Sequence, residues 1–190
     1  MNLKSKKGFT LVELIIVIAI LGIIALIAVP SLTGVQKRSQ VNADIRTAEQ
    51  IGKSVRVWLT DANINEARIR EAYIKVTEET GVSTPVAYKE LSSLATVTGT
   101  DGLGDYISLS YEPNVSNSDG TANAFYVGLV NDKVVVMIYT AEETPYLGDG
   151  VAIYELDDSD DIVKGYAYVE GISALEETNV ETALGVIIGE

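Results

Sequence analysis

The chain has 190 residues, 47% of them hydrophobic, and its 14 basic and 27 acidic residues give a formal net charge of −13. It contains no cysteine and no histidine, which excludes disulfide frameworks, thiolate nucleophiles, the usual zinc ligand sets and every histidine-based acid–base dyad. The lack of cysteine fits both a reducing cytosol and an exported protein, so it does not identify the compartment.

The charge is unevenly distributed along the chain. Residues 1–8 carry three lysines, and eight basic residues fall between positions 37 and 75. Beyond residue 80, three lysines stand against nineteen acidic residues. Such an acidic part is a poor partner for nucleic acid, whose phosphates attract basic patches. We interpret it as a soluble head whose charge resists aggregation, and we predict no nucleic-acid partner.

Residues 11–29 read LVELIIVIAILGIIALIAV, an apolar run with one charge, Glu13. A secretory signal would have a shorter apolar stretch and a better cleavage site than the stretch from Ala25 to Ala28. A plain membrane anchor fits better, since about 20 apolar residues span a bilayer. Neither explains Glu13, because a carboxylate in such a segment is costly and marks a functional site by default. A cut after Gly8 would create a compensating cation, the α-ammonium of Phe9.

The segment KKGFTLVELIIVIAILGIIALIAVPSL closely resembles the N-terminus of type IV prepilins and of the related pseudopilins of type II secretion systems. The resemblance implies that residues 1–8 are a leader, which a membrane prepilin peptidase removes after Gly8. It also implies that the same enzyme methylates the new N-terminal residue, Phe9. Glu13 would then attract the N-terminal ammonium of a neighbouring subunit during assembly. The short basic leader and the phenylalanine are typical of the type IVa subclass.

A long helix is predicted to follow the leader. Residues 9–30 form its hydrophobic membrane or filament-core part, and residues 31–60 form an amphipathic stem. Pro30 predicts a kink, and the resemblance suggests that the helix between Gly22 and Pro30 loosens in the filament. From Thr10 to Leu59 the helix would be roughly 75 Å long.

The stem has one apolar stripe. Apolar residues recur in steps of three and four, which places them on one side of the helix against a core. Trp58 also lies on this side and is expected to be a core anchor. The stripe consists of Val41, Ile45, Ala48, Val55 and Leu59, with Gly52 in the same series.

Residues 61–190 form the predicted acidic head. Helices are expected at 64–79, with Asp61 or Asn63 as the cap, and at 88–94. The sequence VETALGVIIG near the C-terminus predicts either a final strand or a docked tail. The fold class is α+β, with an antiparallel β-sheet packed on the amphipathic half of the long N-terminal helix. Strand-like runs lie at 106–111, 124–130, 133–140, 151–156 and 163–169, with a hairpin at Asn131-Asp132.

The acidic run from Asp157 to Asp161 invites a calcium assignment, since hard cations bind clustered oxygen ligands. It lacks the D-x-D-x-D-G spacing of a known calcium loop, and charge runs are usually solvated turns. We therefore predict no metal site and no cofactor.

The function that these features favour is that of a structural subunit of a type IV pilus acting in adhesion, twitching motility or surface colonisation. The expected partners are the prepilin peptidase and methyltransferase, further copies in a helical homopolymer, and the assembly platform with its ATPase. The subunit would cross the inner (cytoplasmic) membrane once before assembly and lie in the cell-surface pilus, or fimbrium, afterwards. A pseudopilin of a type II secretion or DNA-uptake system is the alternative. A membrane-anchored extracellular enzyme is an interpretation from another class, and the sequence offers no catalytic constellation for it.

Overall fold

A computed structural model describes residues 9–76, 87–116, 120–141, 145, 152–157 and 162–185, without the side chains of residues 27–33. The chain divides into two compact units, Met1–Arg38 and Ser39–Glu190. Helix α1, Leu11–Thr60, is continuous over 50 residues, which confirms the long helix. The helical assignment runs through both Gly22 and Pro30. Within the described residues, no helix combines the length and the apolar character needed to cross a membrane.

A five-stranded sheet forms the centre of the unit Ser39–Glu190, in the order β1-β2-β3-β7-β4. The pairs β1–β2, β2–β3 and β3–β7 are antiparallel, whereas β4 and β7 are parallel. A separate antiparallel pair, β5–β6, completes the described strands. The α+β class is thus confirmed, with one parallel pair that the sequence did not predict. The bounds are β1 Lys89–Glu90, β2 Asn123–Val130, β3 Lys133–Thr140, β4 Ala152–Ile153, β5 Glu155–Leu156, β6 Ile162–Val163 and β7 Gly165–Val169.

The turn between β2 and β3 confirms the predicted hairpin. Val130 pairs with Lys133 across two residues, Asn131 and Asp132, whose φ angles are 48° and 61°. Positive φ at both central positions is the signature of a type I′ turn, whose twist matches that of the flanking strands. Asparagine and aspartate tolerate this conformation better than other residues with a side chain.

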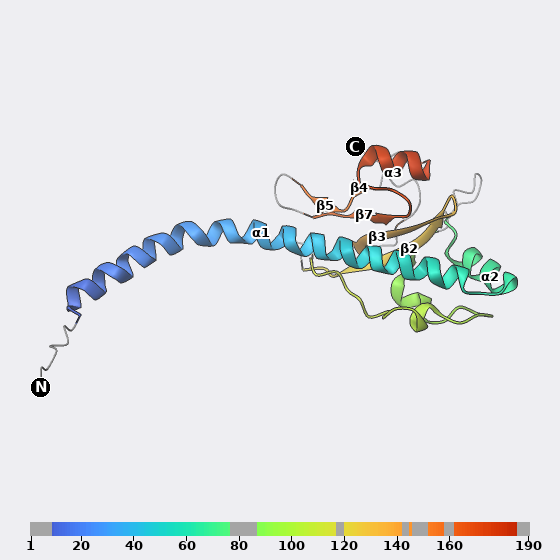
Figure 1. Ribbon diagram of the computed structural model, residues 1–190, viewed down its shortest axis with the longest axis horizontal. Helices are drawn as coiled ribbons and strands as arrows, with labels where there is room; N and C mark the ends of the chain where they lie inside the picture. Colours follow the sequence, from blue (N-terminus) through green and yellow to red (C-terminus); the bar gives the residue numbers. More distant parts are fainter. Residues whose placement is uncertain are drawn as a thin grey trace, which may run out of the picture. The chain divides into compact units, whose positions relative to one another are not determined.

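Both faces of the sheet are covered, so this unit has three layers (Figure 1). On one face, the stem part of α1 packs on side chains that include Val127, Val136 and Ala167. On the other face, helix α3, Glu177–Leu184, contributes Val180 and Leu184 to a second core. The predicted stripe of α1 is confirmed, with Ile45 only half-buried and Ile51 as a buried residue that the prediction did not include. The buried members of the stripe are Val41, Ala48, Gly52, Val55 and Leu59.

The predicted strand at 106–111 is wrong. The 3₁₀ helix η2, Leu103–Asp105, lies just before it, and the N–H groups of Tyr106 and Ile107 donate to the Leu103 carbonyl. These turn hydrogen bonds replace a strand ladder, and the apolar side chains of this segment pack against the core from a loop. In the sheet, the strand that pairs with the free side of β2 is the short β1.

Other predicted elements differ in extent. Helix α2, Ile64–Ile74, ends before Lys75, because the Val76 N–H donates to the carbonyl of Leu129; residues 77–79 of the predicted helix 64–79 lie outside the described part. The predicted helix at 88–94 becomes β1 followed by the 3₁₀ helix η1, Leu91–Ala95. The runs 151–156 and 163–169 each contain a break, at Tyr154 and at Lys164.

The C-terminal segment is helical where the structure describes it. Of the two alternatives, the final strand is wrong for α3, which is helical, whereas a docked tail is confirmed for the described residues, since Val180 and Leu184 are buried in the second core. Gly185 ends this helix with φ 69°, the left-handed conformation that glycine adopts readily. Residues 186–190 lie outside the described part.

Candidate functional site

Thr10 and Glu13 form a reciprocal hydrogen-bonded cap at the start of α1. The Thr10 N–H and hydroxyl both donate to the Glu13 carboxylate, at 2.9 Å each, and the Glu13 N–H donates to the Thr10 hydroxyl oxygen at 3.3 Å. This is the capping box, in which the Ncap and N3 residues satisfy each other's free N–H groups. In the single chain, the carboxylate of Glu13 is therefore held at the N-terminal end of the helix.

The apolar segment that follows the cap has exposed side chains in the described part of the chain. Phe9 is 86% exposed, and every described large hydrophobic side chain from Leu11 to Leu26 is at least 49% exposed. A helix that is apolar all round is buried in a large core or in a membrane. The segment therefore requires a partner that a single chain in water does not provide.

The remaining predicted residues are placed only in part. Gly8 lies outside the described residues. A Cβ added at Gly22 would meet nothing within 4 Å, so there is open space beside this glycine. Only the helical backbone is described at Pro30. Of the predicted residues, the structure thus brings Phe9 and Glu13 to the same end of α1.

A buried carboxylate ties the stem part of α1 to two loops. Asp44 is fully buried. It accepts hydrogen bonds from the N–H and Nδ2 of Asn114 at 2.7 and 2.6 Å, and from the Val115 N–H and the Tyr154 hydroxyl at 3.3 and 3.0 Å. Burial, and then the nearby Asp44 charge, raise the pKa of Tyr154, so this phenol stays a hydrogen-bond donor.

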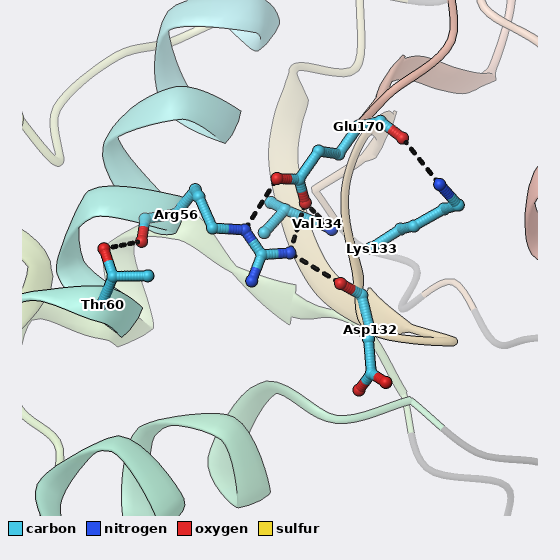
Figure 2. Close-up of polar contacts among 6 residues, drawn as sticks. All are labelled: Arg56, Thr60, Asp132, Lys133, Val134 and Glu170. Carbon is cyan, nitrogen blue, oxygen red and sulfur yellow. Dashed lines mark hydrogen bonds and ion pairs between the residues drawn. The ribbon is translucent and has the colours of Figure 1, made fainter. Parts of the chain in front are cut away.

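A second polar cluster joins α1 to the hairpin turn and to the end of β7 (Figure 2). The Nε–H of Arg56 donates to Glu170 at 2.7 Å, and its Nη2 donates both to the same carboxylate and to the Asp132 carbonyl. Glu170 also accepts the Val134 N–H at 2.9 Å. Partial burial acts to raise the pKa of Glu170, but the bonds from Arg56 and Val134 outweigh it and lower that pKa.

The C-terminal end of α1 has a buried cation. Arg70 of α2 is 1% exposed, donates to the Trp58 carbonyl and stacks over the Trp58 ring, 5.1 Å from its centre. Its Nε–H donates to the Thr100 hydroxyl at 2.7 Å. A positive charge on one of the last carbonyls of a helix is favourable, because these groups lack intrahelical partners and carry the negative end of the helix dipole. Trp58 is confirmed as a core anchor.

No group of three or more acidic, histidine or cysteine side chains in the described part is arranged to hold a metal ion. Of the acidic run considered for calcium, only Asp157 lies within the described residues.

Sequence reasoning missed Thr10, Asp44 and Glu170. For Thr10 the signal was present, because T-x-x-E before an apolar run is the capping-box pattern. Asp44 sits among the polar positions of a helix and Glu170 in an acidic segment. Their partners lie between 36 and 114 residues away, so no local pattern marks either of them.

Comparison with known proteins finds one motif and several partial matches. Residues 3–29 match the prokaryotic N-terminal methylation motif. The chain is 43% identical over 56 residues to the type IV major fimbrial protein FimA of Dichelobacter nodosus, and 52% identical over 44 residues to the type IV major pilin protein PilE1 of Neisseria gonorrhoeae. It is also 54% identical over 39 residues to a fimbrial protein of Pseudomonas aeruginosa. No solved structure gives a significant match.

These matches are confined to one part of each protein. The FimA match covers 30% of this chain and 36% of FimA, and the PilE1 match covers 23% and 27%. The chain thus spans about a third of the length of the curated relatives it matches. Residues 3–29 carry the N-terminal methylation motif, and the chain is similar in part to proteins named as type IV pilins. The three relatives are named as fimbrial or pilin proteins, and none as an enzyme.

Proposed function

We propose that the chain is the structural subunit of a type IV pilus, used in adhesion, twitching motility or surface colonisation. The observation that carries this proposal is the methylation motif at residues 3–29, together with an apolar helix whose single acidic residue, Glu13, lies in its first turn. The named relatives are major pilins and fimbrial proteins, which favours a pilus over a pseudopilus. We assign no enzymatic activity.

Processing supplies the cation that Glu13 lacks. A membrane prepilin peptidase cuts after Gly8, and the same enzyme methylates the new amino group of Phe9. Before assembly, residues 9–30 lie in the inner membrane, where Thr10 provides two hydrogen bonds to the Glu13 carboxylate. In the filament, the ammonium of a neighbouring subunit's Phe9 pairs with Glu13. Such a charge-assisted contact in an apolar setting is stronger than a neutral one.

The other parts of the chain have distinct roles in this proposal. Residues 1–8 are the leader, 31–60 the stem and 61–190 the head, which lies on the outside of the polymer. The helix between Gly22 and Pro30 loosens as subunits pack, and a filament map with unbroken helical density there would contradict this. The assembly platform with its ATPase drives extrusion, and the final location is the cell-surface pilus.

The test begins with mass spectrometry of the membrane-extracted protein. A chain that begins with methylated Phe9 supports processing, whereas a retained leader contradicts it. Gly8→Arg should keep the leader attached and abolish filaments. Electron microscopy of a deletion strain then separates a surface pilus, which would disappear, from a secretion defect without loss of surface fibres.

Glu13→Ala tests the pairing itself. It should permit cleavage and methylation but reduce filaments, because the neighbour's ammonium has no partner. Glu49→Ala is the matched control, since Glu49 is an exposed carboxylate on the same helix, paired with Lys53. Normal filament numbers in Glu13→Ala would refute the pairing.

A further inference from the structure

The basic residues of the unit Ser39–Glu190 point to a contact between copies of the chain. This unit has nine basic residues, all described, against 26 acidic residues. The side chains of three of the nine, Arg46, Arg68 and Lys75, are exposed and make no hydrogen bond, ion pair or ring contact within the described part of the chain. The other six are engaged within the unit: Lys53, Arg56, Arg70, Lys89, Lys133 and Lys164.

Arg46 is central to the outer face of the stem helix. The exposed residues Ala43, Arg46, Gln50, Lys53 and Val57 follow one another in steps of three and four, so they form one stripe, called here the outer stripe. It lies opposite the side of α1 that packs on the sheet. Lys53 is paired with Glu49 at 2.6 Å, whereas Arg46 has no partner within the described residues. Val57 is 52% exposed and adds an apolar element at one end.

The opposite layer carries the complementary charge. Helix α3 covers the other face of the sheet through Val180 and Leu184, and the described segment 176–185 contains no basic residue. Glu176 and Glu177 at its start are exposed. Other exposed acidic groups, such as Asp61, which accepts the Tyr106 hydroxyl, lie at the end of α1. Glu176 and Glu177 thus belong to the layer that covers the face of the sheet opposite to α1.

We propose that the outer stripe of one copy binds the acidic start of α3 on the next copy, with Arg46 against Glu176 and Glu177. This inference rests on the proposed function, because it names a contact of the same polymer. The two surfaces are different patches on opposite faces of one sheet, so the contact is heterologous, and repeated heterologous contacts build open filaments. Heads this acidic repel one another unless their few exposed cations meet acidic groups of a neighbour. An anionic lipid surface would repel the same head, which favours a second copy as the occupant.

Charge reversal tests the contact in cells that hold the assembly machinery and the full chain. Arg46→Glu should reduce sheared surface filaments by roughly tenfold, as expected for a buried interfacial charge pair. Combining it with Glu176→Lys and Glu177→Lys should restore them, while Arg46→Lys should assemble nearly normally. Arg68→Glu is the matched control, an exposed cation outside the stripe, and should stay within about twofold of the unaltered chain.

The outcomes separate this inference from the proposed function. If the unaltered chain forms no filaments in these cells, the proposed function fails. If the unaltered chain forms filaments and Arg46→Glu forms equally many, only the contact is refuted. The same holds if Arg68→Glu reduces the number of filaments as strongly as Arg46→Glu does. Failure of the α3 reversals to rescue Arg46→Glu refutes α3 as the counterpart.

Cross-linking gives an independent measurement, because the chain has no cysteine of its own. A chain with Ala43→Cys and Thr178→Cys, both exposed positions, should give a ladder of multimers when intact filaments are treated with a short bismaleimide. Each single variant should give no ladder. Abundant dimers from Ala43→Cys alone would show that two outer stripes face each other, and this isologous contact would overturn the proposal. The absence of a ladder from filaments of the double variant would overturn it as well.

Discussion

The pairing of Arg56 with Glu170 should be measurable as a coupling free energy. Arg56 donates two hydrogen bonds to one carboxylate, the fork geometry that makes arginine–carboxylate pairs strong. The side chains are 34% and 28% exposed, so solvent screens them more than a fully buried pair. Exposed pairs contribute about 0.2–1 kcal/mol, and we place this partly buried, bidentate pair somewhat higher, at about 1–2 kcal/mol.

The perturbation is a double-mutant cycle with Arg56→Gln, Glu170→Gln and the combined variant. Glutamine keeps most of each side chain's length while removing its charge, so the cycle isolates the pair from lost packing. Unfolding of the full chain in detergent is followed in urea, which does not screen charges. Trp58 is the only tryptophan and is fully buried, so its fluorescence reports opening of the core beside α1.

The stabilisation by the Arg56–Glu170 pair should depend on pH, in a direction set by the pKa of Glu170. The pKa of Glu170 is lowered from 4.5 in the folded chain, so the unfolded chain binds its proton first as the pH falls. The stabilisation is therefore complete above pH 4.5 and is lost as the pH falls below 4.5 through the lowered folded-state pKa. Glu170→Gln should lack this part of the acid sensitivity. A coupling of less than about 0.3 kcal/mol at pH 7, or one that persists unchanged in acid, would refute the reasoning.

Three further predictions concern single residues. Asp44→Ala leaves four donors without an acceptor, two of them buried, the Val115 N–H and the Tyr154 hydroxyl. It should lower the free energy of unfolding by about 3 kcal/mol, whereas Asp44→Asn, which keeps one acceptor oxygen, should lose less; equal urea midpoints for the two variants would contradict this. A Cβ at Gly52 would lie 2.2 Å from the Tyr168 ring, so Gly52→Ala should cost about 1–3 kcal/mol in urea unfolding, while Gly22→Ala should leave the Trp58 transition unchanged. Thr10→Val should be cleaved and methylated normally but give fewer filaments than Thr10→Ser, which keeps the hydroxyl; equal filament counts would rule out a role for the cap.

Local patterns were sufficient for the elements with a strong period or an unusual composition. The steps of three and four from Val41 to Leu59 predicted which side of α1 is buried, because a helix brings such residues onto one face. The hairpin at Asn131-Asp132 was predictable because few residues accept positive φ in a two-residue turn. The strand Lys133–Thr140 also held an unused signal, since its unbroken apolar run indicates a strand that is buried on both faces.

The sequence by itself determined the N-terminal motif, the long helix and the α+β class, because each depends on residues close together in the chain. Only the tertiary structure decided that α3 covers the second face of the sheet, that residues 106–111 form no strand, and that Asp44 and Glu170 are bonded. These outcomes depend on partners far along the chain, and a buried polar group is stable only where folding brings its donors to it.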